Sequence, residues 1–348
     1  MTETTSTPRT YRDYAQPLWR RLLVSREGAV IAALVLVVVF AISFVPHFAQ
    51  PITLTYLLLD ITPILLIALP MTLIIITGEI DLSVASTMGL ASVTLGVLHQ
   101  AGMPIPLAGA IALVVGAAAG ALNGFLITVV GLPSLAVTIG TLALYRGLAV
   151  GLLGTTAVTE FTEFWTDLAK SKIAGTSVPS VVVVILVLAI VFVALLHFTP
   201  FGRGIFAIGL SPETARFSGV KVERTKFILF VLSGLISALA GLYYTLRFSS
   251  ARGDNATGYE LQVIAAVLLG GVSIFGGRGS IVGPLGGVFL IGVLASALRL
   301  ANVTSDVINI ITGTLLVASV VATSFLAWFR TKRARPGKKT EILAVAKG

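Results

Sequence analysis

The sequence contains no cysteine and very little charge. Of its 348 residues none is Cys, and only 11% are Asp, Glu, Lys or Arg. A soluble globular domain carries about 25% charged residues, so a soluble enzyme is excluded. The absence of Cys excludes a disulfide scaffold and leaves the redox compartment undetermined. The three His residues (His47, His99 and His197) stand apart, and no HExxH or Cys/His cluster offers a zinc site.

Apolar residues fill the sequence instead. They make up 56% of it, and the mean hydropathy is +1.00. They occur in runs of about 18 residues or more, long enough to cross a hydrocarbon core of roughly 30 Å as a helix, whereas an outer-membrane barrel shows short alternating segments. The expected fold is an all-α polytopic membrane protein. Candidate spans are 28–44, 55–77, 84–100, 105–130, 133–154, 178–198, 226–246, 259–275, 281–300 and 306–329, roughly ten in all.

The positive charge is clustered beside the apolar spans. Of 24 Lys and Arg, 5 precede residue 28, 5 lie in 199–226 and 7 lie from Arg330 onward. Such clusters mark cytoplasmic segments rather than a nucleic-acid surface. We therefore expect a cytoplasmic N-terminal segment (1–28), a transmembrane domain (29–329) with a cytoplasmic loop (199–226), and a basic cytoplasmic tail (330–348). Segments on the same side of the membrane must be separated by an even number of spans. The expected spans give six between the first two basic segments and four between the last two, so all three can be cytoplasmic.

The cytoplasmic loop contains a short helix signature. Ser211 suits an N-cap, the following Pro suits the first helical position, and Gly219 suits the position just past the helix end. A helix of about seven residues is unstable alone, so it packs on the bilayer, on its own domain or on another protein. The segment from Gly271 to Ser280 lacks the Gly-Lys-Ser/Thr ending of a phosphate loop. If ATP drives this protein, another chain must hydrolyse it.

Two further patterns concern packing and partners. Gly116, Gly120 and Gly124 form a GxxxGxxxG row, and the pairs Gly147/Gly151 and Gly283/Gly287 share its spacing, which favours close helix packing in lipid. On the opposite side of the membrane, Phe161, Phe164, Trp165 and Leu168 share one helical face. That face either lies in the membrane interface or docks an extracytoplasmic partner.

Ionisable residues interrupt the apolar runs at few places. Asp60, Arg146 and Arg299 lie inside expected spans, where charge is costly and faces a partner or a cavity. Gly78 to Ser83 is either a loop or a break inside one long helix. Asp81 either caps the next helix or lines a pathway with Ser83, and we expect capping to be the larger effect. A faint echo of this segment at Gly270–Phe275 predicts an internal repeat.

At Gly78-Glu-Ile-Asp-Leu-Ser-Val84 the sequence resembles the membrane permeases of ribose-type sugar ABC importers. The resemblance covers nearly all of 29–328. It continues through Asn123–Phe125, Leu132–Thr141, Thr199–Arg203, Gly209–Val220, Gly258–Leu261 and Leu269–Ser273. Members of that family usually carry Gly where Glu79 and Ala85 stand here. The resemblance therefore implies that this chain belongs to a subgroup that differs around the possible break at Gly78 to Ser83.

The resemblance implies a homodimer or heterodimer of permease subunits in the bacterial cytoplasmic (inner) membrane. Its partners would be cytoplasmic ATPase subunits and an extracytoplasmic solute-binding protein. The chain would then not be an enzyme and would hold no cofactor, because ATP and Mg²⁺ bind to the ATPase. The expected coupling residues are Ser211, Glu213, Ala215, Arg216, Phe217 and Gly219. The expected pathway or hinge residues are Gly78, Glu79, Asp81, Ser83, Asn123, Thr138, Glu260 and Ser273.

The leading function is ATP-driven import of a monosaccharide or polyol. Within the same superfamily, a branched-chain amino acid, a nucleoside or a furanose-like signal molecule is an alternative solute. From a different class, an ion-coupled secondary transporter would use Glu79 and Asp81 as ion or proton sites, and a membrane scaffold would transport nothing.

Overall fold

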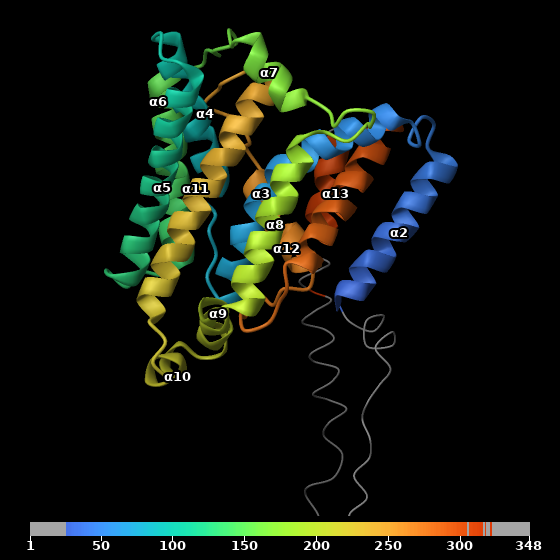
Figure 1. The fold of residues 1–348 in the computed structure, drawn as a ribbon. Coiled ribbons are helices and arrows are strands. Elements are labelled where there is room, and N and C mark those ends of the chain that lie inside the picture. Colours follow the sequence, from blue (N-terminus) through green and yellow to red (C-terminus); the bar gives the residue numbers. More distant parts are fainter. Residues whose placement is uncertain (1–25, 305, 316, 318–320, 322–348) are drawn as a thin grey trace, which may run out of the picture.

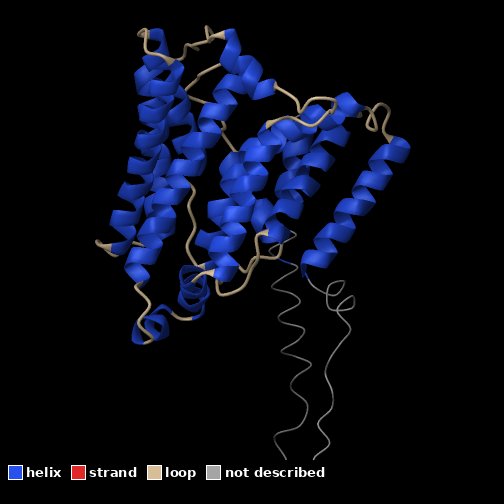
Figure 2. Ribbon diagram, viewed as in Figure 1, coloured by secondary structure: helices blue, strands red, loops and turns tan. Residues whose placement is uncertain are grey.

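The computed structural model describes residues 26–304, 306–315, 317 and 321, and helices dominate that part of the chain (Figures 1 and 2). No strand occurs among the described residues apart from two isolated bridges. The helices are α2 (Arg26–Phe44), α3 (Pro51–Ile76), α4 (Val84–Gln100), α5 (Ile105–Thr128), α6 (Ser134–Leu153), α7 (Glu163–Lys170), α8 (Val181–Phe198), α9 (Pro200–Leu210), α10 (Pro212–Phe217), α11 (Val222–Phe248), α12 (Tyr259–Leu269) and α13 (Val282–Leu300). A shorter apolar helix spans Asp306–Leu315.

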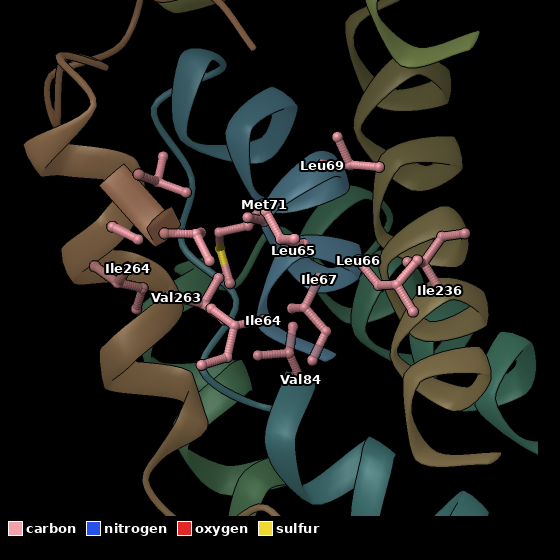
Figure 3. Close-up of a cluster of buried hydrophobic side chains, with 14 of the residues drawn as sticks. Ile64, Leu65, Leu66, Ile67, Leu69, Met71, Val84, Ile236, Val263 and Ile264 are labelled. Atoms are coloured by element: carbon pink, nitrogen blue, oxygen red, sulfur yellow. The ribbon is translucent and has the colours of Figure 1, made fainter. Parts of the chain in front are cut away.

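Helix α3 is the centre of the bundle. It is apolar around its whole circumference, and such a helix is stable only when other helices surround it. From Leu65 to Ile76 every side chain is buried, and α8, α11, α12 and α13 pack around it. Figure 3 shows Leu65 and Leu66 of α3 pointing to different neighbours, with Ile236 of α11 and Val263 of α12 closing the cluster. The segment 77–83, which leaves α3, begins at exposed Gly78 and leads to buried Asp81 and Ser83.

Close glycine contacts join α5 to α11. A Cβ at Gly120 would lie 2.2 Å from the carbonyl oxygen of Phe230, and one at Gly116 would lie 2.3 Å from the Cβ of Ala238. Only glycine allows the two backbones to approach this far. The predicted packing role of this row is confirmed, as it is for Gly283, whose Cβ would meet the carbonyl oxygen of Gly270 at 1.9 Å.

The pair Gly147 and Gly151 does not pack in this way. A Cβ at either position would meet nothing within 4 Å in the described part of the chain. Both glycines lie on the outward face of α6, beside exposed Leu148 and Leu152. The expectation of close helix packing at this pair is wrong within the described chain, because α6 turns its other face, with Tyr145 and Ala149, toward α4 and α5.

Seven helices among the described residues are long and apolar enough to cross a membrane: α2, α3, α5, α6, α8, α11 and α13. The expected count of about ten is not confirmed. Helix α4 has 17 residues, and the span expected at 259–275 is a helix of 11 residues. That helix stops at Leu269 because Gly270 and Gly271 end it. The outer faces of α2 and α8 expose large apolar residues, including Leu36 and Ile190, which suits contact with lipid.

The bundle has two distinct ends (Figure 1). Helices α9 and α10 and the first turn of α2 lie at one end, and α7 lies at the other. The Lys/Arg-rich loop 199–226 and the start of α2 therefore share an end, as the charge pattern predicts. The expected cytoplasmic segments 1–28 and 330–348 lie outside the described residues, except for 26–28.

Candidate functional site

The same backbone turn interrupts the bundle twice. After α3, Gly78 has φ +85°, and the N–H groups of Gly78 and Glu79 donate to the carbonyls of Ile75 and Ile74. After α12, Gly271 has φ +92°, and Gly271 and Val272 donate in the same pattern to Leu268 and Val267. This pair of bonds is a Schellman motif, which ends a helix at a left-handed glycine. The two segments of the sequence echo thus share this helix end, which also follows α4 at Gly102 and α13 at Asn302; the internal repeat stays a prediction.

The first break is a loop that reverses direction, not a kink in one long helix. Residues 77–83 rise from the end where α9 lies, and α4 begins inside the bundle (Figure 1). Ser233, which contacts Asp81, lies near the middle of α11. Non-helical backbone this deep in a membrane domain is tolerated only where protein covers it or water reaches it.

A chain of hydrogen bonds ends on the buried carboxylate of Asp81. Oδ1 accepts from the Oγ of Ser83 at 2.6 Å and from its N–H at 3.0 Å, while Oδ2 accepts from the Oγ of Ser233 at 2.8 Å. The Nδ2 of Asn123 donates to the Oγ of Ser83 at 2.8 Å, and the hydroxyl of Tyr145 lies 3.3 Å from the Oδ1 of Asn123. The network ties the break to α5, α6 and α11. Three donors, the N–H and Oγ of Ser83 and the Oγ of Ser233, compensate the burial of the carboxylate.

Asp81 caps less of α4 than expected. Among the described residues its one backbone donor is Ser83, the residue before α4, and no described side chain caps that helix. Asp81 and Ser83 are each 1% exposed. The carboxylate therefore holds the geometry of the break more than it satisfies the helix end. Ser233 and Tyr145, which complete the network, carried no signal in the sequence because each is one polar residue in a long apolar span.

The first turns of α6 and α11 hold the rest of the break. The N–H of Ile80 donates to the Oγ of Ser134 at 3.3 Å, and the Oγ1 of Thr138 donates to the carbonyl of Ile80 at 3.3 Å. The ammonium of Lys226 forms an ion pair with Glu79, and both side chains are mostly buried. Two expected pathway residues, Thr138 and Glu79, are thus brought to the break.

Glu260 and Ser273 lie outside this network. Glu260 is on the first turn of α12. Ser273 sits in the second break, where its N–H donates to the carbonyl of Arg278 at 3.0 Å. The sequence grouped these two with the residues around Asp81, and no hydrogen bond between described residues joins them to it. They mark a second place in the fold, at the ends of α12.

The predicted short helix of the loop is present as α10. The Oγ of Ser211 accepts from the N–H of Thr214 at 3.2 Å, which confirms the N-cap. Gly219 has φ +84° and closes another Schellman motif, since Gly219 and Val220 donate to the carbonyls of Arg216 and Ala215. The local sequence was sufficient to predict both ends of α10, because helix caps depend on residues close by in the sequence.

The two apolar residues of α10 face opposite ways. Phe217 is 93% exposed, whereas Ala215 is 2% exposed and packs with Ile208 and Val222. The expectation that Ala215 meets a partner is therefore wrong: it fastens α10 to its own membrane domain. Arg216 forms an ion pair with Glu223 across the loop. Phe217 and Glu213 remain exposed at this end of the molecule.

Helix α9 joins α10 to both breaks at one glycine. A Cβ on Gly209 would lie 1.9 Å from the carbonyl oxygen of Ile76 and 2.3 Å from the nitrogen of Gly277. The N–H of Gly277 donates to that same carbonyl at 2.8 Å. The end of α3, the second break and α9 therefore meet backbone to backbone. A displacement of α9 must move the start of the first break and the turn at Gly277 in the second, since packed backbones have no free space between them.

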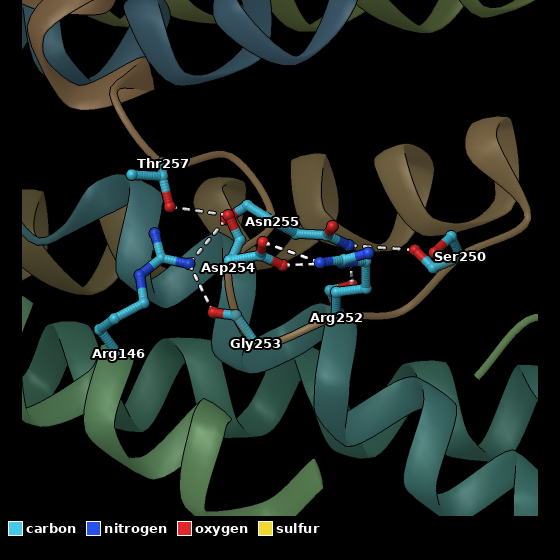
Figure 4. Close-up of polar contacts among 8 residues, drawn as sticks. Arg146, Ser250, Arg252, Gly253, Asp254, Asn255 and Thr257 are labelled. Atoms are coloured by element: carbon cyan, nitrogen blue, oxygen red, sulfur yellow. Dashed lines mark hydrogen bonds and ion pairs between the residues drawn. The ribbon is translucent and has the colours of Figure 1, made fainter. Parts of the chain in front are cut away.

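Arg146 holds another irregular segment, 249–258, which lies between α11 and α12. Its guanidinium donates to the carbonyls of Gly253 and Asn255 at 2.7 and 2.8 Å (Figure 4). It also donates to the carbonyl of Ala85 at 3.4 Å. It thereby satisfies the carbonyls of Gly253 and Asn255, which lie outside the helices, before α12 begins. Next to it, Arg252 forms an ion pair with Asp254, with the Nε of Arg252 2.9 Å from the Oδ1 of Asp254. Arg146 is a structural residue here, although its type alone suggested a pathway charge equally well.

Helix α7 covers the other end of the molecule. Phe161 and Trp165 are partly buried against Leu95 and Ile105, while Phe164 is 65% exposed. The predicted apolar face is therefore split: one edge anchors the segment and the other is free. The helix begins only at Glu163, so Phe161 precedes it.

The chain is similar in sequence to known membrane permeases. Residues 53–320 match the family described as "Branched-chain amino acid transport system / permease component". The autoinducer 2 import system permease protein LsrD of Escherichia coli (strain K12) is 37% identical over 310 residues, covering 87% of this chain and 93% of LsrD. LsrD of Salmonella paratyphi B is 36% identical over 329 residues, covering 90% and 98%. No solved structure matches the chain.

Importer permeases of this kind reside in the bacterial inner membrane and work with an ATPase and a binding protein. Transport, not catalysis, is their task. The family match, the identity to LsrD and the seven candidate spans agree with one another. The chain belongs to the branched-chain amino acid transport system permease family and is a multi-pass permease subunit of an ABC importer.

Proposed function

We propose that this permease imports a small sugar-like solute, with autoinducer 2 or a monosaccharide of similar size as the substrate. The observation that carries the mechanism is the junction at Gly209, where α9 touches the carbonyl of Ile76 and the nitrogen of Gly277. A force applied to α10 reaches both helix breaks through that junction. The substrate class rests on the 37% identity to LsrD over nearly its whole length.

The partner ATPase docks on α10. Phe217 offers an apolar contact that its own chain leaves uncovered, and the exposed Glu213 lies in the first turn of the same helix. Ser211 and Gly219 fix the shape of α10, and the pair Arg216–Glu223 fixes its position on α11. ATP and Mg²⁺ bind to the ATPase, and this chain contributes no cofactor.

The chain crosses the membrane ten times with both termini in the cytoplasm. The seven long helices are joined by α4, by 249–269 and by the helix from Asp306. Six traverses then precede α9 and four follow α10, which matches the Lys/Arg clusters. A second permease subunit, identical or related, completes the pathway. The exposed Phe164 of α7 contacts the solute-binding protein outside.

An ion-coupled mechanism is less well supported. It would need Glu79 and Asp81 free to bind an ion or a proton. Glu79 is paired with Lys226, and both oxygens of Asp81 accept hydrogen bonds from hydroxyl groups. The two carboxylates therefore have structural partners already.

Uptake by the complete importer tests this proposal. Cells that express the permease, its ATPase and its binding protein are given autoinducer 2, D-ribose or L-leucine. We expect ATP depletion by arsenate to abolish uptake of a sugar-like solute, and a protonophore to leave initial uptake in place when ATP is maintained. Uptake that follows the proton gradient instead, or uptake of L-leucine alone, would refute the proposal.

A further inference from the structure

A cavity of about 300 Å³, lined by both apolar and polar side chains, lies between α3, α12, α13 and the helix Asp306–Leu315. Ile64, Ala266 and Val288 belong to its apolar lining. None of the pathway residues expected from the sequence lines it. Its volume is at the lower end of the range of small-molecule sites, about 300–1,000 Å³.

Side chains with unused hydrogen-bonding groups project from the walls. Gln262, Ser296 and Asn309 line the cavity, and no hydrogen bond between described residues occupies their side chains. Gln262 and Ser296 are half-buried, whereas Asn309 is exposed. Half-buried polar groups in a membrane domain are costly unless a partner satisfies them. An amide donates as well as accepts, and so does a hydroxyl, which is the complement of a sugar hydroxyl.

A charged cluster closes the mouth. The Nη1 of Arg299 donates to the Oδ2 of Asp60 at 3.1 Å, and the Nη2 of Arg247 lies 3.6 Å from Oδ1. A second hollow, of about 420 Å³, lies beyond this cluster and includes Gln50 and Thr53 at the start of α3. Leu57, Asp60, Ser296 and Arg299 line both hollows, so the Asp60–Arg299 ion pair stands between them.

We propose that the cavity is a binding site for one neutral, polyhydroxylated solute of monosaccharide size, entered past the Asp60–Arg299 pair. This inference rests on the proposed import of a sugar-like solute. The mouth holds two guanidinium groups against one carboxylate, and both oxygens of Asp60 are engaged, so Asp60 offers no free acceptor for the ammonium group of an amino acid. An amino acid zwitterion would have to break that pair to bind, whereas a neutral polyol needs only the amide and hydroxyl groups. The solute waits here above the two helix breaks until α9 moves.

The first arm of the test measures access to the cavity. The chain has no Cys, so a single thiol reports one position. Ala295 lines only the inner cavity, and Ser237 is a fully buried matched control on α11. In the assembled importer we expect Ala295→Cys to react with a sulfonated methanethiosulfonate from the outside at least ten times faster than Ser237→Cys. Autoinducer 2, delivered by the binding protein, slows this reaction, and L-leucine does not.

The second arm measures transport. Gln262→Leu keeps the volume but removes the hydrogen bonds, and we expect a tenfold or larger loss of autoinducer 2 uptake with normal membrane level and normal ATPase assembly. Leu261→Ala, beside it but facing outward, keeps wild-type uptake. If Ala295→Cys is as unreactive as Ser237→Cys, or if Gln262→Leu transports normally, the site assignment is overturned although import stands. If the wild type imports no sugar-like solute, the proposed function fails, and the reactivity at position 295 alone decides whether the cavity is an open polar site.

Discussion

Replacing Gly209 by Ala should disconnect the ATPase-docking end of the permease from its helix breaks. The new Cβ would lie 1.9 Å from the carbonyl oxygen of Ile76 and 2.3 Å from the nitrogen of Gly277. Both atoms belong to backbone, so no side chain can rotate away. Cβ contacts below about 3.0 Å are essentially never seen, so α9 must withdraw by more than an ångström. The hydrogen bond of 2.8 Å from Gly277 to Ile76 lies in the same contact and would be strained or lost.

The cost can be bounded from known magnitudes. Overpacking of a well-packed site costs about 1–3 kcal/mol, and loss of one hydrogen bond adds about 0.5–1.5 kcal/mol. A gain of up to about 1 kcal/mol from placing Ala in a helix offsets part of this. We therefore expect a protein that still inserts and assembles, with the junction displaced. Uptake should fall at least tenfold, while the basal ATPase activity of the complex remains.

The assay is ATP-driven uptake in proteoliposomes that contain the purified importer, measured beside ATP hydrolysis. Gly204→Ala on the same helix is the matched control, because among the described residues its Cβ would meet one side-chain atom, the Cγ1 of Val220, at 3.3 Å, and no backbone atom within 4 Å. That variant should transport normally. Wild-type uptake by Gly209→Ala would refute the idea that this backbone junction transmits movement from α10 to the breaks.

Three further predictions concern the same machinery. Asp81→Asn should keep most uptake, because an amide can still accept a hydrogen bond from Ser83 and pair with Ser233. Asp81→Ala should lose uptake and cost about 1–3 kcal/mol of folding stability, because it leaves buried hydroxyl groups unsatisfied. If thermal melting shows both variants to be fully stable and both are equally inactive in uptake, the function belongs to the charge instead. Gly219→Val should remove coupling without removing the protein from the membrane, since φ +84° is strained for Val; normal uptake would contradict a rigid docking helix. In intact cells an impermeant thiol reagent should label Thr176→Cys and spare Ser218→Cys, and the reverse pattern would invert the topology.

Local sequence was sufficient wherever a structure depends on near neighbours. The N-cap at Ser211, the left-handed Gly219 and the end of α3 before Gly78 follow from residue types within one turn of the helix end. Helix α4 begins and ends where the sequence predicts, at Val84 and Gln100. The predicted end of span 259–275 was wrong. Apolar residues continue past Leu269, but Gly270 and Gly271 stop the helix there.

Contacts across the bundle could not be predicted in the same way. The sequence showed that Asp81 was unusual but could not supply Ser233, which is 152 positions away and contacts the other carboxylate oxygen. It gave Ala215 and Phe217 the same role, and only the packing of α10 on α9 and α11 separates the buried residue from the exposed one.

Composition and periodicity by themselves determined that this chain is a helical membrane protein with a charged loop at one end, because the bilayer imposes length and apolarity on every span. The tertiary structure decided which charges are structural, as with Arg146 on the carbonyls of Gly253 and Asn255. It also decided that Gly120 is packed while Gly147 is open, and that Gly209 joins two breaks more than 190 residues apart in sequence, Ile76 and Gly277. Those outcomes depend on which helix faces meet, and a face is chosen by the whole bundle rather than by the residues along one helix.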